Sequence, residues 1–236
     1  LSHYQMLNQV EKIFKKWSPA IFLGWSNIGF DDEMIRKEFF KGLRYPYITN
    51  SSPNKRHDGL NIARGAFALD NKILKTETNA KGNAVMKLES LARTNGFETK
   101  GAHSALFDAE LTLKVLGLIK SKQPHTWDSF LKTSNKSDTE TIIKKDKIIT
   151  LNEYFYGKSR LYLCAPLHPK YCTHPIYQWG QAVDLRFDVE PLLKMSISDL
   201  KFQMKKSPKF LRTIRSNKAP IIIDKMYGMK VEPYSA

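Results

Sequence analysis

Apolar side chains recur every three or four positions near the start of the chain, with lysines between them. This spacing predicts an amphipathic helix over residues 2–17. Ser2 and Gln5 resemble a capping box that would begin it, and Ser18-Pro19 should end it. The segment 20–25 is short, apolar and bounded by proline and polar residues, so we expect a buried strand there.

Helical spacing returns three more times before a final long helix that follows His103. The three predicted helices cover Asp32 to about Phe40, 58–69 and 87–93. Asp31 therefore stands between a strand and a helix, the place where α/β folds put their chemistry. The polar stretches 41–56 and 71–83 should be loops, and Gln123-Pro124 should end the long helix.

The pattern changes in the second half of the chain. Residues 133–147 are charged and polar, as expected of a linker. Beyond them, short apolar runs punctuated by proline, glycine and asparagine predict strands at 148–151, 161–165, 181–187 and 221–224. Only 198–205 has the pattern of a helix. These elements together indicate a small second domain rich in β-structure.

The charge balance points to a polyanionic partner. The chain has 38 Lys and Arg against 23 Asp and Glu, a formal net charge of +15. Such an excess suits nucleic acid, although a basic protein without that role would show it too. Two cysteines argue against a disulfide-built secreted domain, and no apolar run is long enough to cross a membrane. We therefore expect a cytoplasmic protein.

Cys164, His168, Cys172 and His174 are residue types that bind zinc. Their spacing is not that of a usual zinc finger, so two ordinary reduced thiols are the simpler interpretation.

The strongest candidate for chemistry is the stretch 101–110. His103 precedes Asp108 by five positions, ahead of a long apolar helix. If the helix begins near Ser104, its positive end disfavours an imidazolium at His103 and leaves a neutral base. Asp108, about one turn inside, can hold a hard cation through oxygen. A surface histidine near a capped helix would show the same pattern.

Several ordered segments make a more specific pattern than any one of them. They are 27–33, 45–47, 54–58, 87–89, 95–96, 102–108, 123–124, 135–136, 165–169 and 191–193. Together they resemble bacterial exonuclease I, a member of the DEDDh group of 3′–5′ exonucleases. The resemblance implies an RNase H-like exonuclease domain over 1–125, incomplete at its N-terminus. A linker over 126–147 and a partial SH3-like domain over 148–236 would follow.

The resemblance also implies a reaction: removal of mononucleotides from the 3′ end of single-stranded DNA, in DNA repair and recombination. Four carboxylates in the family hold two Mg²⁺ ions, and a histidine is the general base. Carried over by position, Asp31 and Asp108 are metal ligands and His103 is the base. Asp32, beside Asp31, is interpreted as the cap of its helix.

The family's DNA contacts fall on five positions of this chain. They are Arg36, Tyr47, Arg64, Lys87 and Lys136. Each has an ordinary alternative, such as a solvated helix face or a core ring. A basic string in the second domain could extend the DNA path or could be plain solvated surface. It comprises Lys205, Lys206, Lys209, Arg212, Arg215 and Lys218.

The chain departs from the family in one respect that bears on activity. The first motif, two carboxylates one residue apart, is expected upstream of the first helix, and the family's C-terminal helical region is not recognised. The similar string 188–190 lies in the second domain and is interpreted as a solvated turn. We therefore expect the 236 residues alone to be inactive and monomeric. A module that only binds single strands is the alternative, and single-stranded-DNA-binding protein is a candidate second partner.

Overall fold

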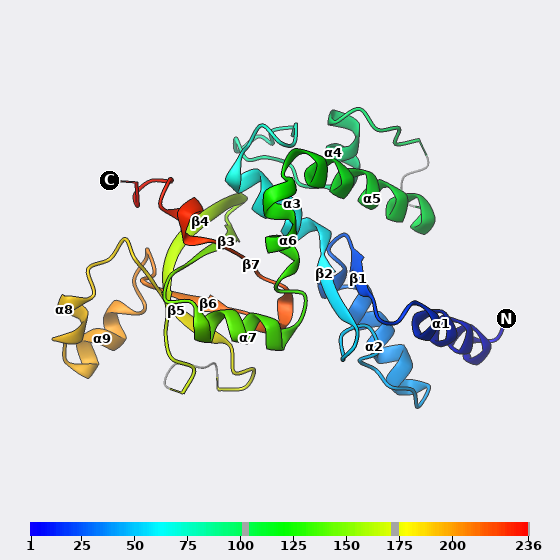
Figure 1. Ribbon diagram of the computed structural model, residues 1–236, viewed down its shortest axis with the longest axis horizontal. Helices are drawn as coiled ribbons and strands as arrows, with labels where there is room; N and C mark the ends of the chain where they lie inside the picture. The colour runs from blue at the N-terminus through cyan, green and yellow to red at the C-terminus, as the bar shows by residue number, and fades with distance from the viewer. Residues whose placement is uncertain (101–103, 171–174, 236) are drawn as a thin grey trace. The chain divides into compact units, whose positions relative to one another are not determined.

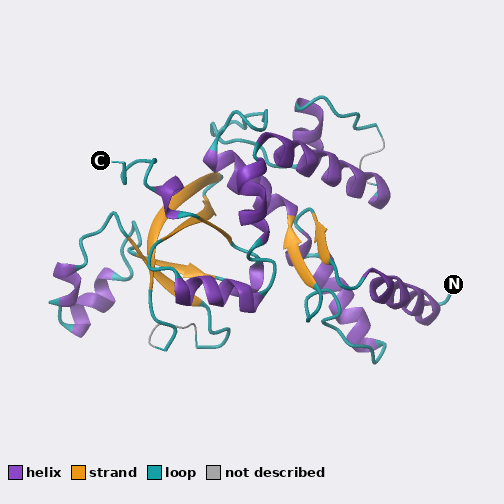
Figure 2. Ribbon diagram, in the orientation of Figure 1, coloured by secondary structure: helices purple, strands orange, loops and turns teal. Residues whose placement is uncertain are grey.

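The computed structural model describes residues 1–100, 104–170 and 175–235 and separates into two compact units (Figure 1). The first comprises Leu1–Ala63 and Lys72–Pro124, and the second comprises Arg64–Asn71 and His125–Ala236. Both helices and strands are present, which confirms a mixed α/β protein (Figure 2). The RNase H-like and SH3-like assignments, and the expected boundaries at 125 and 148, stay predictions.

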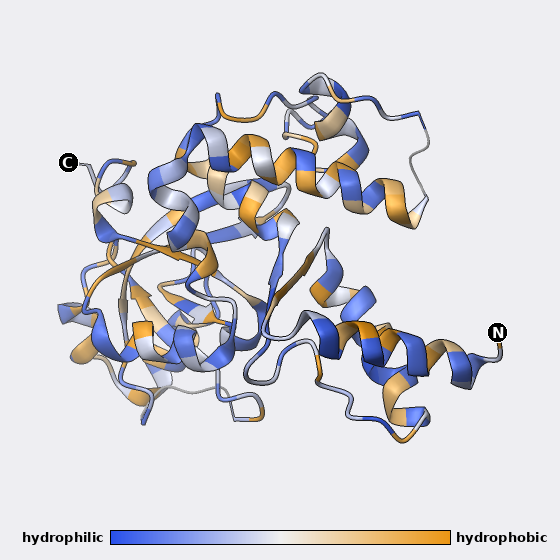
Figure 3. Ribbon diagram, turned by 45° about the vertical axis from the view of Figure 1, so that its right-hand side comes forward, coloured by the Kyte–Doolittle hydropathy of each residue, from blue (hydrophilic) through white to orange (hydrophobic). Residues whose placement is uncertain are grey.

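The first unit opens with α1 (His3–Trp17), and its predicted start is confirmed. The Ser2 side chain accepts from the Gln5 backbone, and Gln5 Oε1 accepts from the Ser2 backbone at 2.9 Å. Lys15 and Lys16 in the last turn suit the negative end of the helix. The helices of this unit carry both apolar and polar residues, as amphipathic packing requires (Figure 3).

Two short parallel strands belong to the first unit. β1 (Ile21–Gly24) pairs with β2 (Lys55–Asp58), with Gly24 opposite Asp58 at their carboxyl ends. The loop expected over 41–56 therefore ends early. Three consecutive residues of β2, Arg56 to Asp58, are buried although they are polar. The short 3₁₀ turn η1 (Asn27–Gly29) then leads from β1 into α2 (Asp31–Lys41).

Three further helices follow the two strands. α3 (Gly59–Leu69) begins in the first unit, and its residues from Arg64 onward cluster with the second. α4 (Leu88–Thr94) packs on α5 (Ala105–Lys122), which buries Leu111, Val115 and Ile119. α5 ends at Lys122, beside the predicted end at Gln123-Pro124, because the residue before a proline disfavours the helical conformation.

The segment predicted to be a linker is mostly helical. It contains α6 (Pro124–Leu131) and α7 (Lys136–Lys145). Asn135 caps α7 by accepting from the Asp138 backbone at 2.7 Å, and Thr139 and Ile143 are buried. Polar composition was a poor guide here, since two buried side chains per helix suffice to hold a short helix on a core.

The second unit contains a curled antiparallel sheet with the order β6-β5-β4-β3-β7 (Figure 1). Its strands are β3 (Ile149–Phe155), β4 (Lys158–Pro166), β5 (Gly180–Asp184), β6 (Leu211–Ile214) and β7 (Ile221–Ile223). Four of them were predicted, and β6 was not. The core includes Ile149, Leu151, Cys164, Ile214 and Ile222.

Short helices follow β5, β6 and β7 in the second unit. They are α8 (Glu190–Leu193), α9 (Ile197–Gln203), the 3₁₀ turn η2 (Ser216–Lys218) and α10 (Lys225–Gly228). α9 matches the helix predicted near 198–205. In the described part of the chain, no helix is both long and apolar enough to cross a membrane.

Candidate functional site

Asp31 is the first residue of α2, and its side chain is exposed. It shares the first helical turn with Asp32 and Glu33, where carboxylates are favoured by the positive end of the helix. Phe30 occupies the cap position and offers no side-chain hydrogen bond. Asp31 is thus an available carboxylate that follows a strand end, as the sequence predicted.

Asp32 is not the helix cap that we expected. It is 7% exposed and forms an ion pair with Arg56 of β2, with Oδ2 3.0 Å from the guanidinium nitrogen. Burial raises the pKa of Asp32, and the Arg56 charge and a hydrogen bond from Asn27 oppose that shift. Asp32 therefore ties α2 to the sheet, and its role is structural.

Asp58 is an acidic residue that the sequence analysis did not single out. Its Oδ1 accepts from the backbone N–H groups of Ser26 and Leu60, each at 2.9 Å. Burial raises the pKa of Asp58, and these backbone hydrogen bonds oppose the shift. The carboxylate thereby fixes the turn after β1 and the start of α3. The consecutive polar residues of β2 were the available signal, since such a run rarely forms a buried strand.

Asp108 is the fourth residue of α5, and its side chain is partly buried. Ser104 is the cap position, with no side-chain hydrogen bond, so the predicted helix start is confirmed. His103 lies outside the described residues, and its role stays a prediction.

Asp31 and Asp108 belong to the same unit of the chain. Within 1–100, 104–170 and 175–235, no group of three or more His, Cys, Asp or Glu side chains lies together to hold a metal ion. Carboxylate oxygens nevertheless fit Mg²⁺ in chemical type. The two aspartates would thus be part of a ligand set, and their convergence on one cation stays a prediction.

Two of the predicted DNA contacts lie together in the first unit. The Arg36 guanidinium is 5.7 Å from the centre of the Tyr47 ring, and it is also ion-paired with Glu33. Tyr45 meets Tyr47 edge to face at 6.0 Å, and both rings are exposed. A cation beside exposed aromatic rings is the combination that holds a single strand.

The other three predicted contacts have separate surroundings. Lys87 is exposed at the cap position of α4. The Arg64 guanidinium lies 3.8 Å from the centre of the Tyr154 ring, within the second unit. Lys136, the first residue of α7, is 3.5 Å from the Glu140 carboxylate. Lys87 and Lys136 present charge to solvent, whereas Arg64 has a packing role as well.

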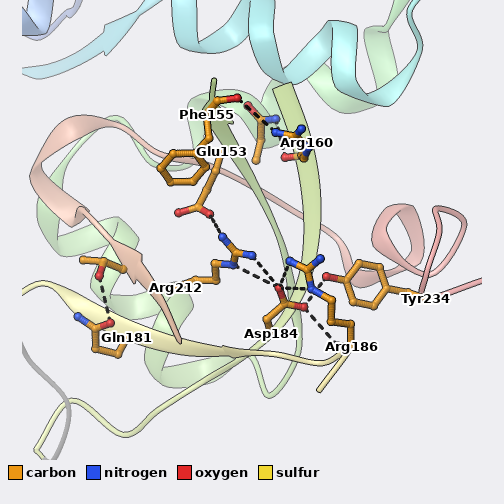
Figure 4. Close-up of polar contacts among 10 residues, drawn as sticks. Glu153, Phe155, Arg160, Gln181, Asp184, Arg186, Arg212 and Tyr234 are labelled. Carbon is orange, nitrogen blue, oxygen red and sulfur yellow. Dashed lines mark hydrogen bonds and ion pairs between the residues drawn. The ribbon is translucent and has the colours of Figure 1, made fainter. Parts of the chain in front are cut away.

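Arg212 does not belong to a surface path in the second unit. It is 7% exposed and pairs with Asp184 at 3.0 Å and with Glu153 at 3.1 Å (Figure 4). Its guanidinium also lies 3.7 Å from the centre of the Tyr162 ring. The basic string from Lys205 to Lys218 is therefore interrupted by a buried arginine that binds the sheet strands together.

The zinc interpretation finds no support at Cys164. This residue is on β4, inside the core of the second unit. Burial raises the pKa of its thiol, which disfavours the thiolate that zinc binds. His168 Nδ1 accepts from the Lys170 backbone at 3.2 Å, whereas Cys172 and His174 lie outside the described residues.

The acidic string 188–190 forms a local turn, as interpreted from the sequence. Asp188 Oδ1 accepts from the Glu190 backbone at 3.0 Å, and Glu190 pairs with Lys194 at 2.7 Å.

Comparison with known proteins gives one consistent result, although no family model matches the chain. It is 31% identical over 189 residues to exodeoxyribonuclease I of Buchnera aphidicola subsp. Acyrthosiphon pisum, covering 75% of this chain and 44% of that protein. It is 29% identical over 186 residues to exodeoxyribonuclease I of Escherichia coli K12, covering 76% and 38%. The chain thus spans less than half the length of these curated relatives.

The fold agrees with these sequence matches. The structure of E. coli exonuclease I in complex with a dA16 oligonucleotide superposes with a TM-score of 0.77. The superposition covers 98% of this chain and 51% of the E. coli chain. At 24% sequence identity, it shows the fold alone. Other matching structures include an ExoI/SSB-Ct complex and a zinc-bound form of the E. coli ExoI–ssDNA complex. The resemblance to bacterial exonuclease I is therefore confirmed, over the part of that enzyme which this chain spans.

Proposed function

We propose that the complete protein is a 3′–5′ exonuclease that degrades single-stranded DNA. The observation that carries this is the match to exodeoxyribonucleases I over three quarters of the chain, joined to the same fold. The solved E. coli enzyme binds single-stranded oligonucleotides, and the net charge of +15 here suits that ligand. A role in DNA repair and recombination follows from the same proposal.

Asp31 and Asp108 would hold Mg²⁺, two ions in the complete enzyme, and His103 would take the proton from the attacking water. Bound Mg²⁺ would supply Lewis-acid stabilisation of the charge that develops on the phosphate. Asp31 stands exposed in the first turn of α2, and the buried Asp32–Arg56 pair holds that turn in place.

The DNA strand would be held by the five positions carried over from the family. Arg36 and Tyr47 would bind a phosphate and a base side by side, since they already contact each other. Lys87, Lys136 and Arg64 would add phosphate contacts.

An assay with a 3′-labelled single-stranded oligonucleotide tests the proposal in the complete gene product that contains this chain. Release of labelled mononucleotide in Mg²⁺ is expected. His103→Ala should lower the rate by about 10²–10⁴-fold, the usual loss for a general base. Asp31→Asn should also abolish most activity, whereas Asp188→Asn, an acid of the second unit, should not. Equal loss in all three variants, or in none, would contradict the assigned roles.

The 236-residue chain itself should show at most trace hydrolysis in the same assay. Among its described residues only two candidate metal ligands are assigned, and no three His, Cys, Asp or Glu side chains lie together to hold a metal ion. Strong Mg²⁺-dependent hydrolysis by this chain alone would contradict the proposal that it carries only part of the metal-ligand set.

A non-catalytic module for single strands is the second candidate. The basic charge and the exposed contact between Arg36 and Tyr47 favour it independently of any metal site. Tight binding without hydrolysis by the complete protein would select it. Single-stranded-DNA-binding protein is a further proposed partner, since one of the matching structures is an ExoI/SSB-Ct complex.

A further inference from the structure

An aromatic pair lies just before β5, at one end of the sheet in the second unit. The rings of Tyr177 and Trp179 stack with centres 4.7 Å apart and planes 18° from parallel. Tyr177 is 52% exposed, and Ile176 beside it is exposed as well. Ile176 and Tyr177 therefore present apolar surface to solvent, with the partly buried Trp179 ring stacked against Tyr177.

The position of Trp179 is fixed by its neighbours. Gly180 begins β5 and is opposite Ile214, the last residue of β6. The residues that follow β6 therefore lie beside those that precede β5. The Trp179 indole Nε1 donates to Asn217 Oδ1 at 2.7 Å, so the ring cannot rotate freely. Gln178 has a φ of 53°, so the chain turns between the two rings.

Positive charge accompanies this pair. The Arg215 guanidinium lies 5.2 Å from the centre of the Trp179 ring, and Arg215 itself is exposed. Lys218 closes the adjacent turn η2. The Arg215 charge also acts on Glu153 of β3. Burial raises the pKa of Glu153, and the charges of Arg212 and Arg215 oppose that shift.

We propose that Tyr177, Trp179 and Arg215 form a stacking platform that binds one or two bases of a single-stranded nucleic acid. Aromatic faces accept any base, and a guanidinium beside them can neutralise the adjoining phosphate. The pre-set ring geometry lowers the ordering cost of binding. The platform rests on the proposed function, because single-stranded DNA is its ligand, but it needs neither the metal site nor hydrolysis.

Binding of a fluorescein-labelled oligothymidylate to the 236-residue chain tests the platform. Tyr177→Ala should weaken binding by roughly 5- to 150-fold, which corresponds to about 1–3 kcal/mol for one stacked base. Tyr177→Phe keeps the ring and should retain binding. Tyr156→Ala is the matched control, since that tyrosine is 95% exposed in the turn between β3 and β4, at the opposite end of β4. The Tyr156→Ala variant should bind oligothymidylate with the same affinity as the parent chain.

Two further measurements remain informative if Tyr177→Ala folds poorly. The oligonucleotide should quench tryptophan fluorescence, and Trp179→Phe should remove that quenching while Trp17, Trp25 and Trp127 remain. An abasic oligomer of equal charge should bind the parent more weakly than oligothymidylate. Equal affinity of the two oligomers, or unchanged affinity in Tyr177→Ala, would overturn the platform.

The outcomes separate this inference from the proposed nuclease. Binding that depends on Tyr177, without hydrolysis by the complete protein, supports the platform and contradicts the nuclease. Hydrolysis by the complete protein, with binding unchanged in the Tyr177 and Trp179 variants, supports the nuclease and contradicts the platform. Absence of any binding of oligothymidylate to the 236-residue chain contradicts the platform.

Discussion

Adjacent aspartates at the start of α2 have opposite surroundings. Asp31 is exposed and Asp32 is buried against Arg56. Each position along a helix rotates the side-chain direction by about 100°, so Asp31 can face solvent while Asp32 faces the interior. The sequence analysis preferred Asp31 as the ligand, and the burial of Asp32 is consistent with that choice.

Asp32→Ala should lower the free energy of unfolding by about 3–5 kcal/mol, because the Arg56 guanidinium stays buried without this carboxylate. Asp31→Ala should cost less than about 1 kcal/mol, the worth of a carboxylate at a helix start. Urea denaturation of the two variants measures the difference. Equal losses of unfolding free energy would mean that the buried Asp32–Arg56 ion pair does not hold α2 to the sheet. The double variant Asp32→Leu with Arg56→Met should recover much of the loss.

The buried carboxyl of Asp58 predicts a dependence of stability on pH. Burial raises its pKa above the ordinary 3.8, so the unfolded chain ionises first as pH rises. This group therefore favours the folded state below pH 3.8, and that contribution is lost as pH rises through the folded-state pKa.

Asp58→Asn removes this titration and retains an oxygen that accepts from Ser26 and Leu60. The variant should gain stability relative to the parent as pH rises from 4 to 7. Unfolding midpoints in urea across that range measure the gain. A stability difference that is constant with pH would show that Asp58 titrates normally.

At the scale of elements, α7 shows how local capping overrides composition. Its residues are mostly charged and polar, yet Asn135 caps it and two side chains are buried. The cap therefore offers a direct test of whether this element, predicted as linker, is ordered.

Asn135→Ala should destabilise the second unit by about 1 kcal/mol, the usual cost of losing a helix cap. Thermal unfolding followed by circular dichroism measures it. Lys136→Ala, the next residue, should leave stability within about 0.5 kcal/mol of the parent. The same stability in both variants would indicate that α7 does not contribute to the folded unit.

For the whole molecule, the net charge of +15 should make binding to single strands strongly dependent on salt. Each phosphate contact contributes about −0.7 to the slope of log affinity against log salt. Lys87→Ala should reduce the slope by about that amount, since Lys87 is exposed and assigned to DNA. Lys158→Ala, an exposed lysine with no such assignment, should not change it. Titrations at several salt concentrations measure both slopes.

Most elements could be predicted from the sequence because their signals are local. Helical spacing, the capping box at Ser2 and the apolar runs of β3, β4 and β7 each act within a few residues. The ordered motifs also identified the exonuclease I resemblance, because they fix positions along the chain. These signals specified Asp31 and Asp108 as candidates before any contact was known.

Tertiary structure alone decided which charged residues are buried. Nothing within a few residues of Asp32 or Arg212 distinguishes them from solvated neighbours, and at Asp58 the polar run of β2 was the only local signal. Their partners are 24, 32 and 28 positions away, at Arg56, Ser26 and Asp184 respectively. A charge is buried only where the fold brings a distant partner to it, since desolvation without that partner costs several kcal/mol. The pairing of the polar strand β2 with β1 was hidden for the same reason.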